Sequence, residues 1–235
     1  MPIQDDDLLV YEPTGLLYRK DPVKDDLNII RESKAVYQDL SVGPDDMVLD
    51  LGGHIGSAAK MFLDAGARTF SVEPMVENYE VLCRNLAPYE GRAGAVNAAV
   101  APAGVEKLSF YPHLKGHPAM GRTQHVRGRK PVEVKAVSLE DLLEEHQPTI
   151  IKCDIEHGEY ELPAMKNLPK RVRGLFMELH GKIQIGTPNE LLPYNKMMLD
   201  FEQSLLDQGF EPVMRHVKVA WNHPFAICAT YQRIA

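Results

Sequence analysis

The amino-acid sequence predicts an α/β fold in which a mostly parallel, seven-stranded sheet carries helices on both faces. Short apolar runs alternate with segments of helical periodicity from residue 47 to residue 209. The first run, 47–51, enters a glycine-rich turn, and the second, 69–72, ends in an acid followed by a proline. Repeated alternation of this kind is typical of parallel sheets that are covered on both sides.

The individual elements follow from apolar periodicity and from turn residues. We expect strands at 47–51, 69–72, 93–100, 105–111, 132–137, 149–153, 172–179, 210–214 and 225–232. We expect helices at 26–40, 56–65, 76–86, 139–145 (with Ser138 as the N-cap), after Gly158, and at 189–208. Residues 1–235 are expected to form one domain, with 1–45 as an N-terminal extension and helix and 112–131 as a basic loop insertion. The first 25 residues form an acidic arm without a clear period.

Composition excludes several classes of protein. The chain has 235 residues, 44% hydrophobic and 25% charged, which is typical of a folded globular protein. A net charge of −7 argues against a general nucleic-acid or membrane binder. The three cysteines give no disulfide framework and no metal-binding pair. The acidic N-terminus is unlike a signal peptide and no apolar run is long enough to span a bilayer, so we expect a cytoplasmic protein.

A glycine-rich turn follows the first predicted strand, in the sequence Val-Leu-Asp-Leu-Gly-Gly-His-Ile-Gly at 48–56. Glycines let the backbone turn tightly and approach a ligand in the crevice beyond the strand ends. Glu73 comes 23 residues after Asp50, at the end of the second strand, where a carboxylate can accept hydrogen bonds from both hydroxyls of a ribose. The residues expected to contact a nucleoside cofactor here are Asp50, Gly52, Gly53, His54, Gly56 and Glu73.

Two cofactor classes use this arrangement. A dinucleotide site would require glycine at positions 52, 54 and 57, but the sequence has His54 and Ser57. Asp50 would also lie close to a negatively charged pyrophosphate. S-adenosylmethionine carries a positive sulfonium and an amino group, which an acid at the strand end suits better. The pattern favours this methyl donor, with a nicotinamide-dependent oxidoreductase and a turn that binds no ligand as alternatives.

Six blocks of sequence resemble the FkbM-type methyltransferases and come in that family's order. They are 48–56, Ser-Val-Glu-Pro at 71–74, Asn-Ala-Ala-Val at 97–100, Val-Ser-Leu-Glu-Asp-Leu-Leu at 137–143, Ile-Ile-Lys-Cys-Asp-Ile-Glu-His-Gly-Glu at 150–159 and Met-Glu-Leu-His at 177–180. The resemblance implies a Rossmann-like class I methyltransferase fold and methylation of hydroxyl oxygens on sugars or natural products. It also implies that Pro74, Asn97 and Ala98 belong to the donor site. Two departures stand out: His54 replaces the family's usual Asn, and His157 precedes a glycine that usually follows the acid directly.

Charged residues gather at the ends of two later strands. Lys152, Asp154 and Glu156 share one parity, and the strand that ends at His180 contributes a further acid at 178. The carboxyl ends of parallel strands meet at one edge of the sheet, so these groups should converge beside the donor. Asp154 is expected to contact the donor as well.

Methyl transfer to an alcohol requires alignment and removal of a proton. We expect His180 or Asp154 to act as the base, with Glu156 and Lys152 orienting or polarising the acceptor. Two alternatives remain open. The first is a buried network in which Lys152 pairs with Asp154, Glu156 or Glu178 and only holds the strands together. In the second, the acids and His180 bind a cation such as Mg²⁺, which would lower the pKa of the acceptor hydroxyl.

The segment from Lys107 to Val132 is basic within an acidic protein. It contains no Asp or Glu and includes Lys115, Arg122, Arg127, Arg129 and Lys130. It is expected to be either a solvated loop or a lid that favours a small-molecule acceptor bearing phosphate or carboxylate. A third hypothesis is a non-catalytic or nucleic-acid-directed protein of the same fold that uses this loop. The sequence leaves the oligomeric state open.

Overall fold

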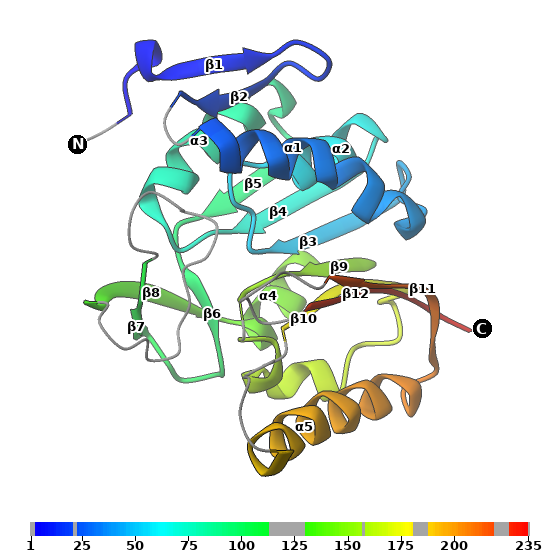
Figure 1. Cartoon of the computed structure of the whole chain (residues 1–235). Helices are drawn as coiled ribbons and strands as arrows, with labels where there is room; N and C mark the ends of the chain where they lie inside the picture. The colour runs from blue at the N-terminus through cyan, green and yellow to red at the C-terminus, as the bar shows by residue number, and fades with distance from the viewer. Residues whose placement is uncertain are drawn as a thin grey trace.

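The computed structural model describes residues 3–20, 23–112, 130–156, 158–180, 188–218 and 226–234, without the side chains of 23–25, 34, 188–195, 216–218 and 226. Figure 1 shows a twisted central sheet with helices on both faces and a small hairpin at one end. The predicted helix at the N-terminus and most of the other predicted elements are present. Within the described ranges, no helix is both long and apolar enough to cross a membrane.

Seven strands of the described chain form the main sheet, in the order β11-β12-β10-β9-β3-β4-β5. Their bounds are β3 (Met47–Leu51), β4 (Arg68–Val72), β5 (Ala93–Val96), β9 (Ile150–Cys153), β10 (Gly174–His180), β11 (Phe210–Lys218) and β12 (Ala226–Arg233). The adjacent strands β5, β4, β3, β9 and β10 are parallel to one another, whereas β12 runs antiparallel to both β10 and β11. The sheet is therefore mixed, because the last strand inserts antiparallel between β10 and β11.

Alternating side chains of the central strands bury two cores on opposite faces of this sheet. On one face, Val48 and Ile150 pack with Phe62 of α2. On the other, Leu49 and Ile151 pack in a larger core. The helices are α1 (Val23–Tyr37), α2 (Ser57–Asp64), α3 (Val76–Leu86), α4 (Leu139–His146) and α5 (Pro188–Leu206). In Figure 1, α1, α2 and α3 lie on one side of the sheet and α4 and α5 on the other, as the sequence predicts.

Two expectations about local structure were wrong. The expected strand at 93–100 divides at Asn97 and Ala98 into β5 and β6 (Ala99–Ala101). A separate three-stranded sheet contains β6, β7 (Lys107–Phe110) and β8 (Val132–Ser138). The helix expected directly after Gly158 is replaced by two short 3₁₀ helices, at Glu159–Glu161 and Pro163–Lys166, because Pro163 interrupts this segment. By contrast, Ser138 caps α4 as expected and accepts a hydrogen bond from the backbone of Asp141.

The acidic arm at the N-terminus is structured, which periodicity did not reveal. After a short 3₁₀ helix at Asp5–Asp7, the strands β1 (Leu8–Tyr11) and β2 (Leu16–Arg19) pair as an antiparallel hairpin. Its apolar side chains pack against Ile30 of α1, Ile55 and Val81 of α3. Strands of four residues are too short for a clear alternation, and tertiary packing stabilises this hairpin.

Candidate active site

A cavity of about 210 Å³ lies beyond the carboxyl ends of β3, β4 and β9. Many of the residues predicted from the sequence border it: Gly52, Gly53, His54, Glu73, Pro74, Ala98, Lys152, Asp154 and Glu156. Four predicted residues are not among those that line it, namely Asp50, Gly56, Asn97 and His180. The fold thus brings the expected donor loop and the expected acids after β9, Asp154 and Glu156, to one space, as expected for groups at the carboxyl ends of parallel strands.

The glycine loop between β3 and α2 requires glycine at two positions, 52 and 56. Gly52 has a φ of +83°, and a Cβ there would lie 1.9 Å from the carbonyl oxygen of Asp154. Gly56 has a φ of +90°, and a Cβ there would lie 2.8 Å from the side chain of Leu82. The loop is therefore wedged between the chain after β9 and helix α3. His54 adopts a φ of +48° in the same loop, which is uncommon for a residue with a side chain.

Asp50 and Lys152 form a buried ion pair, with 3.0 Å between the Asp50 Oδ1 and the Lys152 Nζ. They are direct neighbours in the register of β3 and β9. The Lys152 ammonium also donates to the carbonyl oxygens of Leu51 and Gly52. Although burial alone would lower the pKa of Lys152, the Asp50 charge outweighs it and raises that pKa. From the sequence, Lys152 was expected to pair with Asp154, Glu156 or Glu178; the ion pair with Asp50 corrects that expectation.

Glu73 is buried at the end of β4 with its carboxylate fixed by three donors. The backbone N–H groups of His54 and Met75 donate to it at 2.8 Å each, and the Asn78 amide donates at 3.2 Å. Burial raises the pKa of Glu73 to about 7, against the lowering effect of these hydrogen bonds. The side-chain amide of Asn97 donates to the carbonyl oxygens of Glu73 and Pro74, so Asn97 braces this loop from outside the cavity.

The His54 ring is almost fully buried beside the cavity. Neither ring nitrogen has a hydrogen-bond partner in the described part of the chain, and the nearest charged atom is the Asp26 Oδ1, 3.8 Å from Nε2. Burial lowers the pKa of His54 to about 4, so the ring is neutral at physiological pH. Buried polar atoms without partners are rare in folded proteins and mark places where a ligand or water completes the structure.

At the end of β10, His180 lies among carboxylates. Its Nδ1 is 2.9 Å from the Glu159 Oε1, and its Nε2 is 3.6 Å from Glu156 and 3.7 Å from Glu178. Burial alone would lower the pKa of His180, but Glu156, Glu159 and Asp154 outweigh it and hold that pKa well above its usual value. Donor atoms of Asp154, Glu178 and His180 lie within 4.8 Å of one another, close enough to share a cation.

Several residues of the site were not found from the sequence. Ile29 and Tyr37 of α1 and Phe110 of β7 border the cavity, although each is far from the glycine loop in sequence. Glu159 is fully buried against His180. Asn78 follows Glu73 by five residues in the next helix, a spacing that could have indicated its contact. His157 and the basic segment from 113 to 129 lie outside the described residues.

Comparison with known proteins gives the family. A model described as the methyltransferase FkbM domain matches residues 50–212, which is more than half of the chain. The chain belongs to the FkbM methyltransferase family. It is an S-adenosylmethionine-dependent methyltransferase, and this decides between the two cofactor classes that the glycine loop left open. No curated protein sequence matches the chain at a significant level.

Solved structures that resemble this FkbM methyltransferase are distant. Precorrin-6y C5,15-methyltransferase from Geobacter metallireducens has 14% identity, covering 100% of this chain and 97% of that one, with a TM-score of 0.48. M. jannaschii TYW2 in complex with AdoMet has 13% identity over 99% and 89%, with a TM-score of 0.48. A putative tRNA methyltransferase from Streptococcus pneumoniae has 12% identity over 87% and 74%, with a TM-score of 0.45. Likeness at this level says nothing about the acceptor.

The residues of this FkbM methyltransferase suit S-adenosylmethionine. The cavity has the buried Glu73 carboxylate where a ribose acid is expected, and the carboxylates of Asp154 and Glu156 also border it, which is compatible with the donor's positive charge. Asp50 does not provide that charge directly, because Lys152 neutralises it and the Ser71 hydroxyl donates to it at 3.1 Å. His54, whose ring nitrogens make no hydrogen bond within the described residues, borders the same space.

Proposed function

We propose that this methyltransferase transfers the methyl group of S-adenosylmethionine to a hydroxyl oxygen of a small polyhydroxylated acceptor, such as a sugar or a natural product. The observation that carries the proposal is that Asp154, Glu156 and Glu178 border the same cavity as the glycine loop and Glu73. A hydroxyl-rich molecule can donate hydrogen bonds to these carboxylates. Sequence resemblance to FkbM-type enzymes supports the same acceptor class.

The reaction needs the acceptor oxygen in line with the donor's methyl carbon and a group that accepts the hydroxyl proton. We assign the base to Asp154, because it borders the cavity directly beside Gly52 of the donor loop. His180 is not among the lining residues, and Glu159 holds its Nδ1. The acceptor oxygen bonds to the methyl carbon, the carbon–sulfur bond breaks, and S-adenosylhomocysteine leaves with the former sulfonium as a neutral thioether.

The remaining polar residues have supporting parts. Glu156 borders the cavity, 3.6 Å from the Nε2 of His180, and in this proposal it orients the acceptor hydroxyls. Lys152 keeps the donor loop in position through the carbonyl oxygens of Leu51 and Gly52. The basic segment 112–131 remains the proposed lid for an acceptor that bears phosphate or carboxylate.

We include a divalent cation, Mg²⁺ or Mn²⁺, as a second way to activate the acceptor. Asp154, Glu178 and His180 offer two carboxylate oxygens and one ring nitrogen within 4.8 Å of one another. The Glu159 carboxylate on the other ring nitrogen resembles the partner that orients a metal-bound histidine. A cation held there would lower the pKa of a bound hydroxyl.

Two measurements test the proposal. Calorimetry should detect binding of S-adenosylmethionine and S-adenosylhomocysteine at micromolar concentrations. Radioactive methyl transfer should then be scanned over sugars, glycosides, polyhydroxylated natural products and transfer RNA, with and without EDTA. Transfer to RNA but to no small hydroxyl compound would contradict the acceptor class. Loss with EDTA that Mg²⁺ or Mn²⁺ restores would support the cation, and full activity in EDTA would rule it out.

A variant pair tests the assignment of the base. Asp154→Asn should lower kcat by about 10²–10⁴-fold, the range typical of a lost general base. Glu161→Gln is the matched control, since Glu161 is an exposed carboxylate in the 3₁₀ helix beside Glu159. Unchanged turnover in Asp154→Asn on a true acceptor would remove Asp154 from the role.

A further inference from the structure

The N-terminal segment, defined here as residues 3–37, lies before the matched family domain yet forms part of the donor site. The family match begins at residue 50. Nevertheless, Ile29 and Tyr37 of α1 border the cavity. The hairpin is also tied to the helices beside the glycine loop: the Asn85 amide exchanges two hydrogen bonds with the backbone of Leu17 and donates to the carbonyl of Ile55, at 2.7 to 2.9 Å.

A buried ion pair joins the two parts of this segment. Arg19 ends β2 and Asp26 lies in α1, and their exposed fractions are 7% and 0%. The Arg19 guanidinium donates to both Asp26 oxygens, at 3.0 Å from Nε and 2.6 Å from Nη2, and the Arg19 backbone N–H donates at 2.9 Å. A two-point arginine–carboxylate contact fixes the direction of the guanidinium as well as its position.

The remaining guanidinium nitrogen points towards the ribose acid. Arg19 Nη1 donates to the Asn78 Oδ1 at 2.9 Å, and the Asn78 Nδ2 donates to the Glu73 Oε1 at 3.2 Å. An amide side chain has one accepting end and one donating end. Arg19 can only donate and an ionised Glu73 can only accept, so both favour the orientation of Asn78 in which the NH₂ group faces Glu73. Without Arg19, the Asn78 oxygen loses the donor that fixes it, and the amide is held less firmly against the carboxylate.

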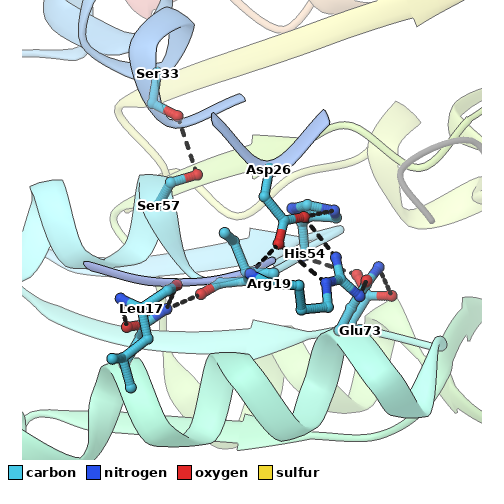
Figure 2. A network of polar contacts seen from close by, with 10 residues as sticks. Leu17, Arg19, Asp26, Ser33, His54, Ser57 and Glu73 are labelled. Atoms are coloured by element: carbon cyan, nitrogen blue, oxygen red, sulfur yellow. Dashed lines mark hydrogen bonds and ion pairs between the residues drawn. The ribbon is translucent and has the colours of Figure 1, made fainter. Parts of the chain in front are cut away.

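Asp26 also lies near the glycine loop. Its Oδ1 is 3.8 Å from the Nε2 of His54, the loop residue whose backbone N–H donates to Glu73 at 2.8 Å. Figure 2 shows Arg19, Asp26, His54 and Glu73 close together, with Leu17 and the Ser33–Ser57 contact nearby. The hydrogen-bonded route from the N-terminal segment to Glu73 therefore runs through Arg19 and Asn78, since the His54 ring is neutral and makes no hydrogen bond to Asp26.

We propose that Arg19, held by Asp26, is a positioning residue that acts through Asn78 to orient Glu73 for the ribose of S-adenosylmethionine. The N-terminal segment is then an obligatory part of the donor site, and its docking sets donor affinity. This inference rests on the assignment of Glu73 to the ribose, which belongs to the proposed site.

A double-mutant cycle on the full chain tests the relay, with S-adenosylhomocysteine as the probe and calorimetry as the readout. Arg19→Gln combined with Asp26→Asn removes both buried charges together and should weaken binding about tenfold. Asn78→Ala breaks the same relay without touching the ion pair and should give a similar loss. In a Glu73→Gln background, neither change should weaken binding further, because the group on which they act is gone.

The controls separate the relay from simple docking of the segment. Arg84→Gln breaks the exposed contacts of Arg84 with Asp5 and Ile3, which also tether the segment, and should leave affinity unchanged. The relay would be overturned if Arg84→Gln weakened S-adenosylhomocysteine binding as much as Arg19→Gln with Asp26→Asn does. It would also be overturned if the changes at Arg19, Asp26 or Asn78 weakened binding as much in the Glu73→Gln background as in the wild type. If Glu73→Gln alone leaves affinity unchanged, the ribose assignment fails. If the double-mutant cycle gives the expected result but no hydroxyl compound accepts the methyl group, only the proposed acceptor class is contradicted.

Discussion

Two buried clusters of charged residues lie at the ends of neighbouring strands of the sheet, and they differ in their ratio of acidic to basic groups. The Asp50–Lys152 pair joins one anion to one cation at 3.0 Å, and the Lys152 ammonium also donates hydrogen bonds to two backbone carbonyl oxygens. Around His180, the carboxylates of Glu156, Glu159 and Glu178 all lie within 3.7 Å of a single imidazole. The first cluster pairs one anion with one cation, whereas the second gathers three carboxylates around one imidazole.

We propose that this difference reflects two different roles. A buried pair of one anion and one cation needs no ligand, and the contacts of Lys152 with the carbonyl oxygens of Leu51 and Gly52 suit a role in holding the glycine loop. Titratable groups gathered beside a cavity are more often found at functional sites, and Glu156 and Glu178 of the second cluster border the cavity. In this proposal Asp50 and Lys152 hold the loop, whereas Glu156 and Glu178 contact the acceptor.

The largest expected effect comes from breaking the Asp50–Lys152 pair. Lys152→Met leaves the Asp50 carboxylate buried without its cation and should lower the free energy of unfolding by about 3–5 kcal/mol. Urea unfolding measures this loss. The double change Asp50→Asn with Lys152→Met should recover most of it, because neither charge is then left buried. A loss of less than about 1 kcal/mol in the single variant would mean that the pair does not hold the loop.

The cluster around His180 should respond differently. Glu178→Gln keeps the size of a side chain that borders the cavity, so it should change the free energy of unfolding by less than about 1 kcal/mol while methyl transfer falls. Thermal unfolding and turnover of the same preparation measure both. Destabilisation comparable to that of Lys152→Met would show that the cluster is structural after all.

A smaller effect concerns pH at the donor end. The pKa of Glu73 rises from 4.5 to about 7 in the fold, so the contribution of this group to stability is present below pH 4.5 and is lost as pH rises through 7. Donor binding has the opposite sign, since the ionised carboxylate accepts the ribose hydroxyls better. Affinity for S-adenosylhomocysteine should therefore fall as pH drops below 7, and Glu73→Gln should flatten this profile. An unchanged slope in the variant would assign the titration elsewhere.

The smallest effect is expected far from both clusters. Lys107 and Glu133 form an ion pair on the surface of the small sheet, with side chains 65% and 67% exposed. Water and salt screen such pairs, so Lys107→Ala should leave the unfolding temperature unchanged within error. A clear drop would indicate that surface charges contribute more to this fold than its buried clusters suggest.

The comparison also explains which parts of the site could be predicted. Gly52, Glu73 and Asp154 stand at strand ends, where local pattern and the geometry of parallel sheets together fix their place. The partner of Lys152 was predicted wrongly, because register between β3 and β9 decides it and no local pattern carries that register. The β1–β2 hairpin was missed for a related reason, since its apolar side chains become meaningful only against α1 and α3.

The sequence by itself determined the alternation of strands and helices, the glycine loop, the acid after β4 and the family. These depend on residue type and on spacing within short segments, which apolar periodicity and backbone sterics control. Only the tertiary structure decided that Asp50 meets Lys152, that Glu159 meets His180, and that Arg19 and Asn78 lead to Glu73. Such contacts join distant segments, and they arise from strand register and helix docking, which many different local sequences can satisfy.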